Sequence, residues 1–239
     1  MLRPYEKMWK NTVEANALLY KLFTDATNRN PMLKMHRDFI EDNNYGFGER
    51  AFHFLWYVLI MIMPTRFKCL EIGVYKGQIT TLIQIIARVL QKKCDMIVVS
   101  PFSSSADKYS VYAEEDYFGA FIALHQMFNL DPHYVGIVKS FSHSPFTSET
   151  LAGKTFDLIY IDGSHDYDVV CKDIELCKGL LKVNGYLVMD DASYFLNMPE
   201  TLFSGHREVG LAVQKHLEDD DNYKHVIAIG HNRIFRKIK

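Results

Sequence analysis

From residue 67 to the end of the chain, short apolar runs alternate with longer segments that have helical periodicity. Runs such as MIVV, within 95–100, are apolar at every position, so both faces of such a strand would be apolar. This is typical of strands buried on both faces. The pattern predicts an α/β fold, a doubly wound and mainly parallel sheet with helices on both faces. The expected strands are 67–73, 95–100, 134–140, 156–162 and 185–191, and the expected helices are 80–92, 115–129, 167–182 and 205–219.

The two ends of the chain depart from this alternation. Residues 1–65 have no strand pattern, but 12–26 and 50–63 have apolar residues at helical spacing. We therefore expect a helical extension of two or three helices over 1–65, followed by the main domain over 66–239. The end of the chain, YKHVIAIGHNRIFRKIK, predicts two strands joined by GHN. This antiparallel hairpin would complete a seven-stranded sheet.

Composition excludes several classes of partner. The net charge is −2, with acids and bases mixed along the chain, so no basic surface for nucleic acid is expected. The most apolar stretch, 51–64, is shorter than the ~20 residues that a membrane span needs, and the first residues lack the apolar core of a signal peptide. We expect a cytoplasmic protein that is not bound to a membrane.

Glycines follow the first expected strand, where an α/β sheet places a nucleotide-binding loop. The order is E-x-G-x-x-x-G, with Glu71, Gly73 and Gly77. Glycine allows both a tight turn and close approach of a ligand, although a strand-to-helix turn alone could explain the spacing. The dinucleotide fingerprint G-x-G-x-x-G is absent, which disfavours a dehydrogenase. The second strand ends in Ser100, where an acid that binds ribose is usual.

Carboxylates follow the fourth and fifth expected strands. Asp162 begins the motif DGSHDY, which includes His165, and Asp190 and Asp191 end the fifth strand. Adjacent parallel strands would bring the three carboxylates together, and a cation such as Mg²⁺, Mn²⁺ or Ca²⁺ would offset their repulsion. The alternative is that these acids cap helices or accept backbone hydrogen bonds in turns. His143, after the third strand, is expected to be a loop histidine.

Three segments resemble class I S-adenosylmethionine-dependent methyltransferases, and more narrowly the branch that includes macrocin O-methyltransferases. They are LEIGVYKG (70–77), residues 156–193 and the terminal hairpin, and the resemblance extends over 67–239. It implies a Rossmann-like methyltransferase fold. It also implies a site for S-adenosylmethionine lined by Glu71, Gly73, Tyr75, Gly77, Ser100 and Asp162.

The same resemblance implies a divalent-metal-dependent O-methyltransferase that acts on a sugar or glycosylated small molecule. Asp162, Asp190 and Asp191 would bind Mg²⁺ or Mn²⁺, and His165 would be the general base. Such a metal lowers the pKa of a bound hydroxyl, and an imidazole with a usual pKa of ~6.5 can take its proton near neutral pH.

Several alternatives stay open at this point. The acceptor could be a catechol-like phenol, or the chain could be a non-catalytic subunit that keeps the fold. Residues 43–50, with Gly46 and Gly48 as hinges and Tyr45 and Phe47 as contacts, and residues 191–208 could each be a lid or an inert surface loop. The N-terminal helices could join two copies in a homo-oligomer or could simply cover the core.

Overall fold

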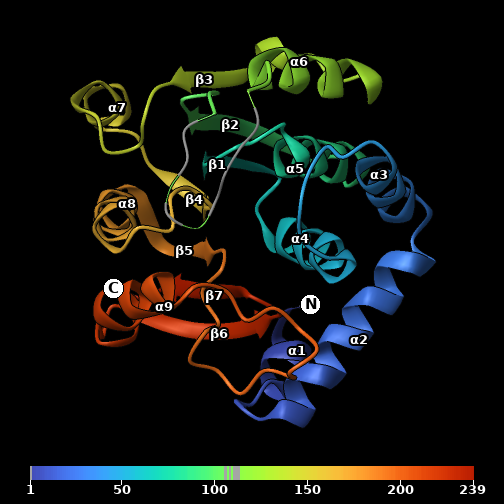
Figure 1. Ribbon diagram of the computed structural model, residues 1–239, viewed down its shortest axis with the longest axis vertical. Helices are drawn as coiled ribbons and strands as arrows, with labels where there is room; N and C mark the ends of the chain where they lie inside the picture. Colours follow the sequence, from blue (N-terminus) through green and yellow to red (C-terminus); the bar gives the residue numbers. More distant parts are fainter. Residues whose placement is uncertain (1, 105–106, 108, 110–113) are drawn as a thin grey trace.

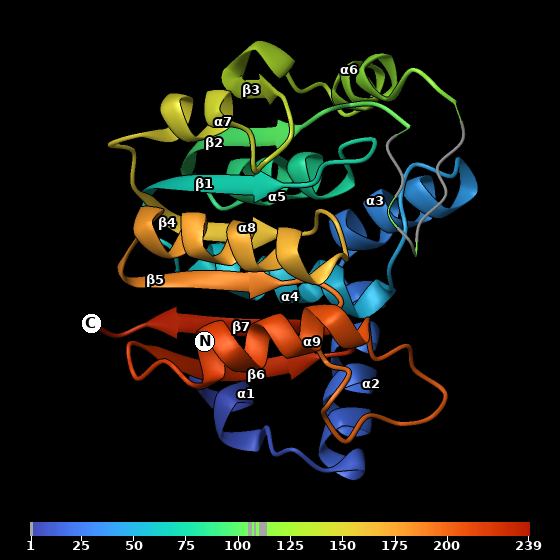
Figure 2. The same cartoon turned by 60° about the vertical axis from the view of Figure 1, so that its left-hand side comes forward.

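The fold is a seven-stranded sheet between two layers of helices (Figures 1 and 2). The computed structural model describes residues 2–104, 107, 109 and 114–239. The strand order is β3-β2-β1-β4-β5-β7-β6, in which the first five strands pair in parallel and β7 is antiparallel to both β5 and β6. The strands are β1 Arg66–Ile72, β2 Lys93–Ser100, β3 Val135–Lys139, β4 Phe156–Ile161, β5 Leu181–Met189, β6 Tyr223–Ile229 and β7 Asn232–Lys237. The predicted fold class is confirmed.

Each face of the sheet has its own hydrophobic core, because successive strand residues point to opposite faces. Cys69 and Val98 belong to the core under the first layer of helices, whereas Leu70 and Val99 belong to the other core. The first layer contains α1 Leu2–Met8, α2 Val13–Arg29, α3 Pro31–Asp42, α4 Arg50–Ile62, α5 Gln78–Val89 and α6 Tyr117–Met127. The second contains α7 Pro145–Leu151, α8 Tyr167–Leu180 and α9 Arg207–Val213, which continues as a π-helical turn over Gln214–Glu218.

The N-terminal extension is part of the first layer. Helix α4 packs against α5, and the ring of Trp56 lies 5.0 Å from that of Tyr160 on β4. Residues 2–65 form four helices: α2 and α4 correspond to the helices expected over 12–26 and 50–63, and α1 and α3 are additional. Helix α3 begins at Pro31, and the side chain of Asn30 accepts hydrogen bonds from the first turn. Within the described residues, no helix combines the length and apolarity needed to span a membrane.

The strand ends that matter for function lie along one edge of the sheet. Figure 2 shows β1, β2, β4, β5 and β6 pointing the same way, with β7 running in the opposite direction. The turn between β6 and β7 therefore lies at the same edge as the carboxyl ends of the parallel strands. Because β7 lies between β5 and β6, this turn comes close to the end of β5.

Candidate functional site

A cavity of about 660 Å³ opens at this edge. Eight of the nine predicted site residues line it: Glu71, Gly73, Tyr75, Ser100, Asp162, His165, Asp190 and Asp191. Gly77 is not among the lining residues. The cavity therefore joins the glycine-containing loop after β1 to the acidic ends of β4 and β5, as expected for a ligand site in an open α/β sheet.

The two glycines of the first loop have different roles. Gly73 has φ +82°, and a Cβ atom built on it would lie 1.7 Å from the carbonyl oxygen of Asp162. Gly77 has φ +92° and precedes the first residue of α5, where a Cβ atom would lie 2.7 Å from the ring of Phe121. Gly73 thus keeps the loop close to the end of β4, whereas Gly77 allows α5 to pack against α6.

Polar side chains at the ends of β1 and β2 are buried. The Oε2 atom of Glu71 accepts a hydrogen bond of 2.6 Å from the Thr80 hydroxyl, and burial raises the pKa of Glu71 to about 8. The Ser100 hydroxyl accepts a hydrogen bond from the backbone N–H of Phe102. Tyr75 packs against Phe47, with 4.9 Å between the ring centroids. These groups form the half of the cavity near β1 and β2.

All three predicted carboxylates line the cavity, but of the three only Asp190 and Asp191 belong to a group whose ligand atoms all lie within 4.8 Å of one another. None of them caps a helix, since Asp166 precedes α8 and His206 precedes α9. The Tyr160 hydroxyl donates to Asp162 at 3.0 Å. Burial and the charges of Asp190 and Asp191 raise the pKa of Asp162 well above its usual range. Burial raises the pKa of Asp190 to about 6. Asp162 and Asp190 are thus costly to ionise without a nearby positive charge, whereas the hydrogen bond to His165 and the nearby histidines outweigh burial and lower the pKa of Asp191.

His165 lies between two carboxylates. Its Nε2 atom is 2.9 Å from Oδ2 of Asp191, and its Nδ1 atom is 2.8 Å from Oδ2 of Asp107. Burial alone would lower the pKa of His165, but the hydrogen bond to Asp191 and the charges of Asp191, Asp107 and Asp190 raise it above the usual value. Asp107 also accepts a hydrogen bond from the backbone N–H of His165, at 2.8 Å. Asp107 therefore fixes both the backbone and the ring of His165.

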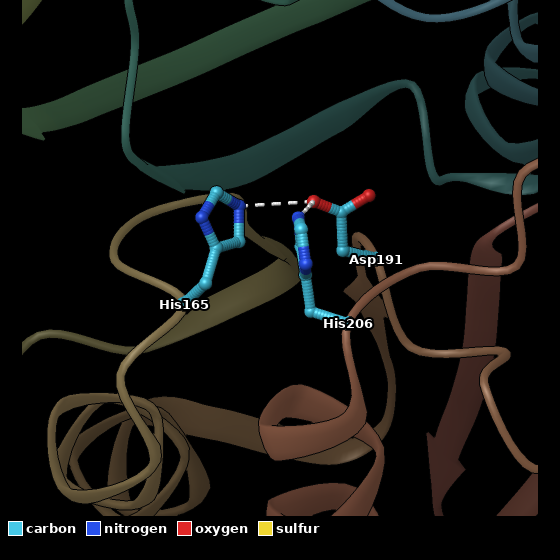
Figure 3. Close-up of side chains that lie close together, drawn as sticks. All are labelled: His165, Asp191 and His206. Atoms are coloured by element: carbon cyan, nitrogen blue, oxygen red, sulfur yellow. Dashed lines mark ion pairs between the residues drawn. The ribbon is translucent and has the colours of Figure 1, made fainter. Parts of the chain in front are cut away.

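Two further histidines reach Asp191. Figure 3 shows His206, from the segment before α9, pointing at the same carboxylate as His165; its Nε2 atom is 3.6 Å from Oδ2. His231, in the β6–β7 turn, has Nε2 at 3.5 Å from Oδ1 of Asp190 and 3.7 Å from Oδ1 of Asp191.

Sequence reasoning missed Asp107, His206 and His231. One signal could have indicated His231. If the first strand of a terminal hairpin runs in the same direction as the preceding strand, the turn of that hairpin lies at the edge of the sheet where ligands bind. His143, the expected loop histidine, is exposed in a turn and lines the cavity.

Both candidate lids contribute to the cavity wall and are attached to the N-terminal helices. Gly46, Phe47 and Gly48 line the cavity, and Arg37 on α3 donates to the carbonyl oxygens of Phe47 and Gly48. In the other segment, the backbone carbonyl of Asn197 accepts a hydrogen bond of 2.8 Å from the side chain of Asn16. The N-terminal helices therefore position the walls of the site.

The acidic half of the cavity fits a divalent cation. Ligand atoms of Asp190, Asp191 and His231 lie within 4.8 Å of one another, as do those of His165, Asp191 and His206. The Nδ1 atom of His231 is buried and has no hydrogen-bond partner within the described part of the chain. A cation would offset the repulsion among the carboxylates, and carboxylate and imidazole are both usual metal ligands.

A family model described as a methyltransferase domain matches residues 70–192, just over half of the chain. The chain belongs to this methyltransferase family. The match begins within β1, ends just after β5 and includes both acidic strand ends. A comparison with curated proteins finds no match.

Solved structures have the same fold at low sequence identity. A Staphylococcus aureus protein assigned as a caffeoyl-CoA O-methyltransferase has a TM-score of 0.64 and 16% identity, over 93% of this chain and 100% of that one. The S-adenosylhomocysteine-bound methyltransferase PaMTH1 of Podospora anserina has a TM-score of 0.55 and 16% identity, over 92% and 88%. The calicheamicin methyltransferase CalS11 has a TM-score of 0.54 and 12% identity, over 92% and 91%. The shared fold is that of class I S-adenosylmethionine-dependent methyltransferases.

Proposed function

We propose that the protein transfers the methyl group of S-adenosylmethionine to a hydroxyl of a sugar or glycosylated small molecule, with the help of a divalent cation. One observation carries this proposal. The loop that contains Gly73, the carboxylates of Asp162, Asp190 and Asp191, and the imidazole of His165 all line a single cavity. A methyl donor and a hydroxyl bound near the acids would therefore lie next to each other, and such positioning supplies much of the rate of a methyl transfer.

The methyl donor fits the half of the cavity near β1 and β2. The backbone of Gly73 allows close approach, and the ring of Tyr75 supplies an apolar surface. Glu71 and Ser100 are the polar groups at the ends of these strands. Ser100 offers one hydroxyl where an acid is usual, so we expect a single hydrogen bond to the ribose there.

The acceptor hydroxyl fits the acidic half. A bound cation would stabilise the negative charge that develops on this oxygen. Asp162, Asp190 and Asp191 would hold the cation, which would offset the cost of ionising Asp162 and Asp190, whose pKa values burial raises. The adjacent wall contains the rings of Tyr109 and Phe203, against which the C–H face of a sugar ring can pack.

His165 is the proposed general base. In its neutral form, Nδ1–H donates to Asp107, and Nε2 would take the acceptor's proton once the acceptor hydroxyl replaces Asp191 as its partner. The resulting imidazolium donates from both nitrogens, and carboxylate oxygens of Asp107 and Asp191 lie 2.8 and 2.9 Å away to receive these bonds. The two acids thus stabilise the protonated product of the transfer.

A catechol-like acceptor is the second candidate, because aromatic rings surround the histidines. The ring centroid of Tyr109 is 4.5 Å from that of His206, and that of Phe203 is 5.4 Å from it. A flat phenol could stack in this space. A catechol and a sugar diol could each bind one cation through two adjacent hydroxyls.

The first test is calorimetric titration with S-adenosylhomocysteine, with Mg²⁺ and again with EDTA. Methyl transfer is then measured as S-adenosylhomocysteine formed with glycosylated compounds, catechols and single-hydroxyl compounds as acceptors. We expect binding of S-adenosylhomocysteine, and turnover that requires the cation and two adjacent hydroxyls. The Asp190→Asn variant should lose turnover, whereas Asp168→Asn, a matched change at an exposed position on α8, should not.

Each part of the proposal can fail separately. Absence of S-adenosylhomocysteine binding would refute methyl transfer and favour a non-catalytic subunit. Full turnover in EDTA would refute the role of the cation. A preference for catechols over every glycosylated acceptor would replace the first candidate by the second.

A further inference from the structure

His231 is buried, and no side-chain hydrogen bond explains the position of its ring in the described part of the chain. Its Nε2 atom points at two carboxylate oxygens but lies 3.5 Å from Oδ1 of Asp190 and 3.7 Å from Oδ1 of Asp191. These separations are longer than the 2.7–2.9 Å expected when an imidazolium donates to a carboxylate. Its Nδ1 atom is buried and has no partner in the described part of the chain.

Aromatic packing fixes the orientation of the His231 ring. The ring centroid of Phe52 lies 4.6 Å away and that of Phe203 lies 5.2 Å away, both in edge-to-face geometry. Its neighbour Asn232 donates to Oδ1 of Asp190 at 2.5 Å, which holds that carboxylate in place. The ring is therefore held with one nitrogen directed at two carboxylate oxygens, of which Oδ1 of Asp190 also accepts from Asn232.

The separations fit two ligands of one metal ion. Two bonds of about 2.1 Å that meet at roughly 110–120° place their ligand atoms about 3.4–3.6 Å apart. The three atoms of Asp190, Asp191 and His231 lie within 4.8 Å of one another. The second group, His165 with Asp191 and His206, fits less well, because both ring nitrogens of His165 already contact carboxylates within 3 Å.

We propose that His231 binds the divalent ion together with Asp190 and Asp191, and that this imidazole makes the centre select a transition ion over Mg²⁺. The assignment rests on the proposed metal-dependent function and specifies its metal. Mg²⁺ prefers oxygen ligands and keeps much of its water, whereas ions from Mn²⁺ to Zn²⁺ bind imidazole nitrogen well.

Asp191 then separates two histidine environments. Its Oδ1 atom faces His231, whereas its Oδ2 atom is 2.9 Å from His165 and 3.6 Å from His206. One oxygen serves the metal and the other serves the proton-accepting histidine. His206 is consequently a matched control for His231, since both imidazoles lie at similar distances from the same carboxylate.

The test uses Mn²⁺ and Mg²⁺ as probes on the full chain after treatment with EDTA. Mn²⁺ affinity is measured from the electron paramagnetic resonance signal of the free ion, and Mg²⁺ affinity by calorimetry. We expect the wild type to bind Mn²⁺ at least ~10-fold more tightly than Mg²⁺. The His231→Asn variant should bind Mn²⁺ about 10-fold more weakly and Mg²⁺ within about 3-fold of the wild type, because the amide supplies an oxygen ligand. His206→Ala should change Mn²⁺ affinity by less than about 3-fold.

A spectroscopic measurement keeps the proposal testable if a variant folds poorly. Pulsed electron paramagnetic resonance of Mn²⁺ bound to the wild type should show coupling to an imidazole nitrogen. That coupling should persist in His206→Ala and disappear in His231→Asn, with circular dichroism to confirm that each variant is folded. Bound Mn²⁺ without nitrogen coupling, or coupling that is lost only in His206→Ala, would overturn the assignment.

The closing measurement is S-adenosylhomocysteine binding by the same samples. If S-adenosylhomocysteine binds but Mn²⁺ and Mg²⁺ have equal affinities that His231→Asn does not change, the proposal about His231 is wrong and methyl transfer stands. If Mn²⁺ binds with nitrogen coupling but S-adenosylhomocysteine does not bind, the metal centre stands and the proposed function fails.

Discussion

The buried pair His36 and His53 and the buried His165 have opposite electrostatic environments. In the N-terminal layer, Nδ1 of His36 is 2.9 Å from Nε2 of His53, and Nε2 of His36 is 3.1 Å from the Thr81 hydroxyl. Burial, with the charge of Arg37, lowers the pKa of His36 to about 3, and burial also lowers that of His53 well below its usual value. These two rings are neutral core residues.

At the strand ends, His165 is also buried, but carboxylates surround it. The hydrogen bond to Asp191 and the nearby charges outweigh burial and raise its pKa. The comparison teaches that burial does not mark a functional histidine, whereas carboxylate partners in a cavity do. If this is correct, substitutions at His36 or His53 should alter stability, and substitutions at His165 should alter turnover.

The largest expected effect is on turnover in His165→Ala. Loss of a general base typically lowers the rate by ~10²–10⁴-fold, whereas S-adenosylhomocysteine affinity should change little because His165 lies in the acidic half of the cavity. Turnover is measured with saturating methyl donor, and donor-product binding by calorimetry.

The matched control for this change is His133→Ala, at an exposed position before β3, which should leave turnover within about 2-fold. Equal turnover in His165→Ala and the wild type would contradict the assignment of the base and would break the contrast between His165 and the buried pair His36 and His53.

The next effect is on stability in His36→Ala. The variant loses the stacked contact with Phe128, at 4.8 Å between ring centroids, and leaves the Nε2 atom of His53 without its hydrogen bond. We expect a loss of about 3 kcal/mol in the free energy of unfolding, measured by chemical denaturation. Turnover per folded molecule should stay within about 2-fold. A large loss of turnover with unchanged stability would show that His36 acts in turnover, as proposed for His165.

Sequence periodicity predicted the sheet and most of its helices, and it brought Asp162, Asp190 and Asp191 to one edge. This worked because Asp162 directly follows β4, and Asp190 and Asp191 are the first two residues after β5. Short helices were missed, such as α7 (Pro145–Leu151), which is too short to show a periodic pattern. Strand β5 begins at Leu181, earlier than expected, because LKVN continues the helical pattern of α8.

The rest of the site depends on contacts between residues far apart in the sequence. Asp107 meets His165 across 58 positions, from a loop after β2 that has no strand or helix pattern. His231 reaches Asp190 only because β7 inserts between β5 and β6. Local patterns cannot predict such pairings, since they follow from strand order and loop path.

A smaller effect is the loss of folding stability at low pH that arises from His36. The pKa of His36 is about 3 when folded and should be near 6.5 when unfolded, so the unfolded chain takes up a proton first as the pH falls. Stability from this group is therefore present above about pH 6.5 and is lost between about pH 6.5 and pH 3. From about pH 7 to pH 5, His36→Gln should lose about 2 kcal/mol less stability than the wild type, measured by denaturation at each pH. Parallel pH curves would contradict a neutral buried His36.

The smallest effect expected concerns Asp107, which acts through His165. Asp107→Asn keeps an oxygen that can accept from Nδ1–H and from the backbone N–H of His165, but it removes the negative charge and the hydrogen bond that Oδ1 accepts from the backbone N–H of Tyr109. We expect about a 10-fold loss of kcat with KM for the methyl donor unchanged, since the ring stays in place and only the stabilisation of the imidazolium weakens. Asp107→Ala also removes both hydrogen bonds to His165 and should cost about 10-fold more, because the ring is then free to turn away from the acceptor. If both variants lost the same activity, the charge of Asp107 rather than its position would be what matters. If neither lost activity, the carboxylate that faces Nδ1 would have no role in proton transfer, and Asp191 alone would account for the difference between His165 and the neutral pair in the N-terminal layer.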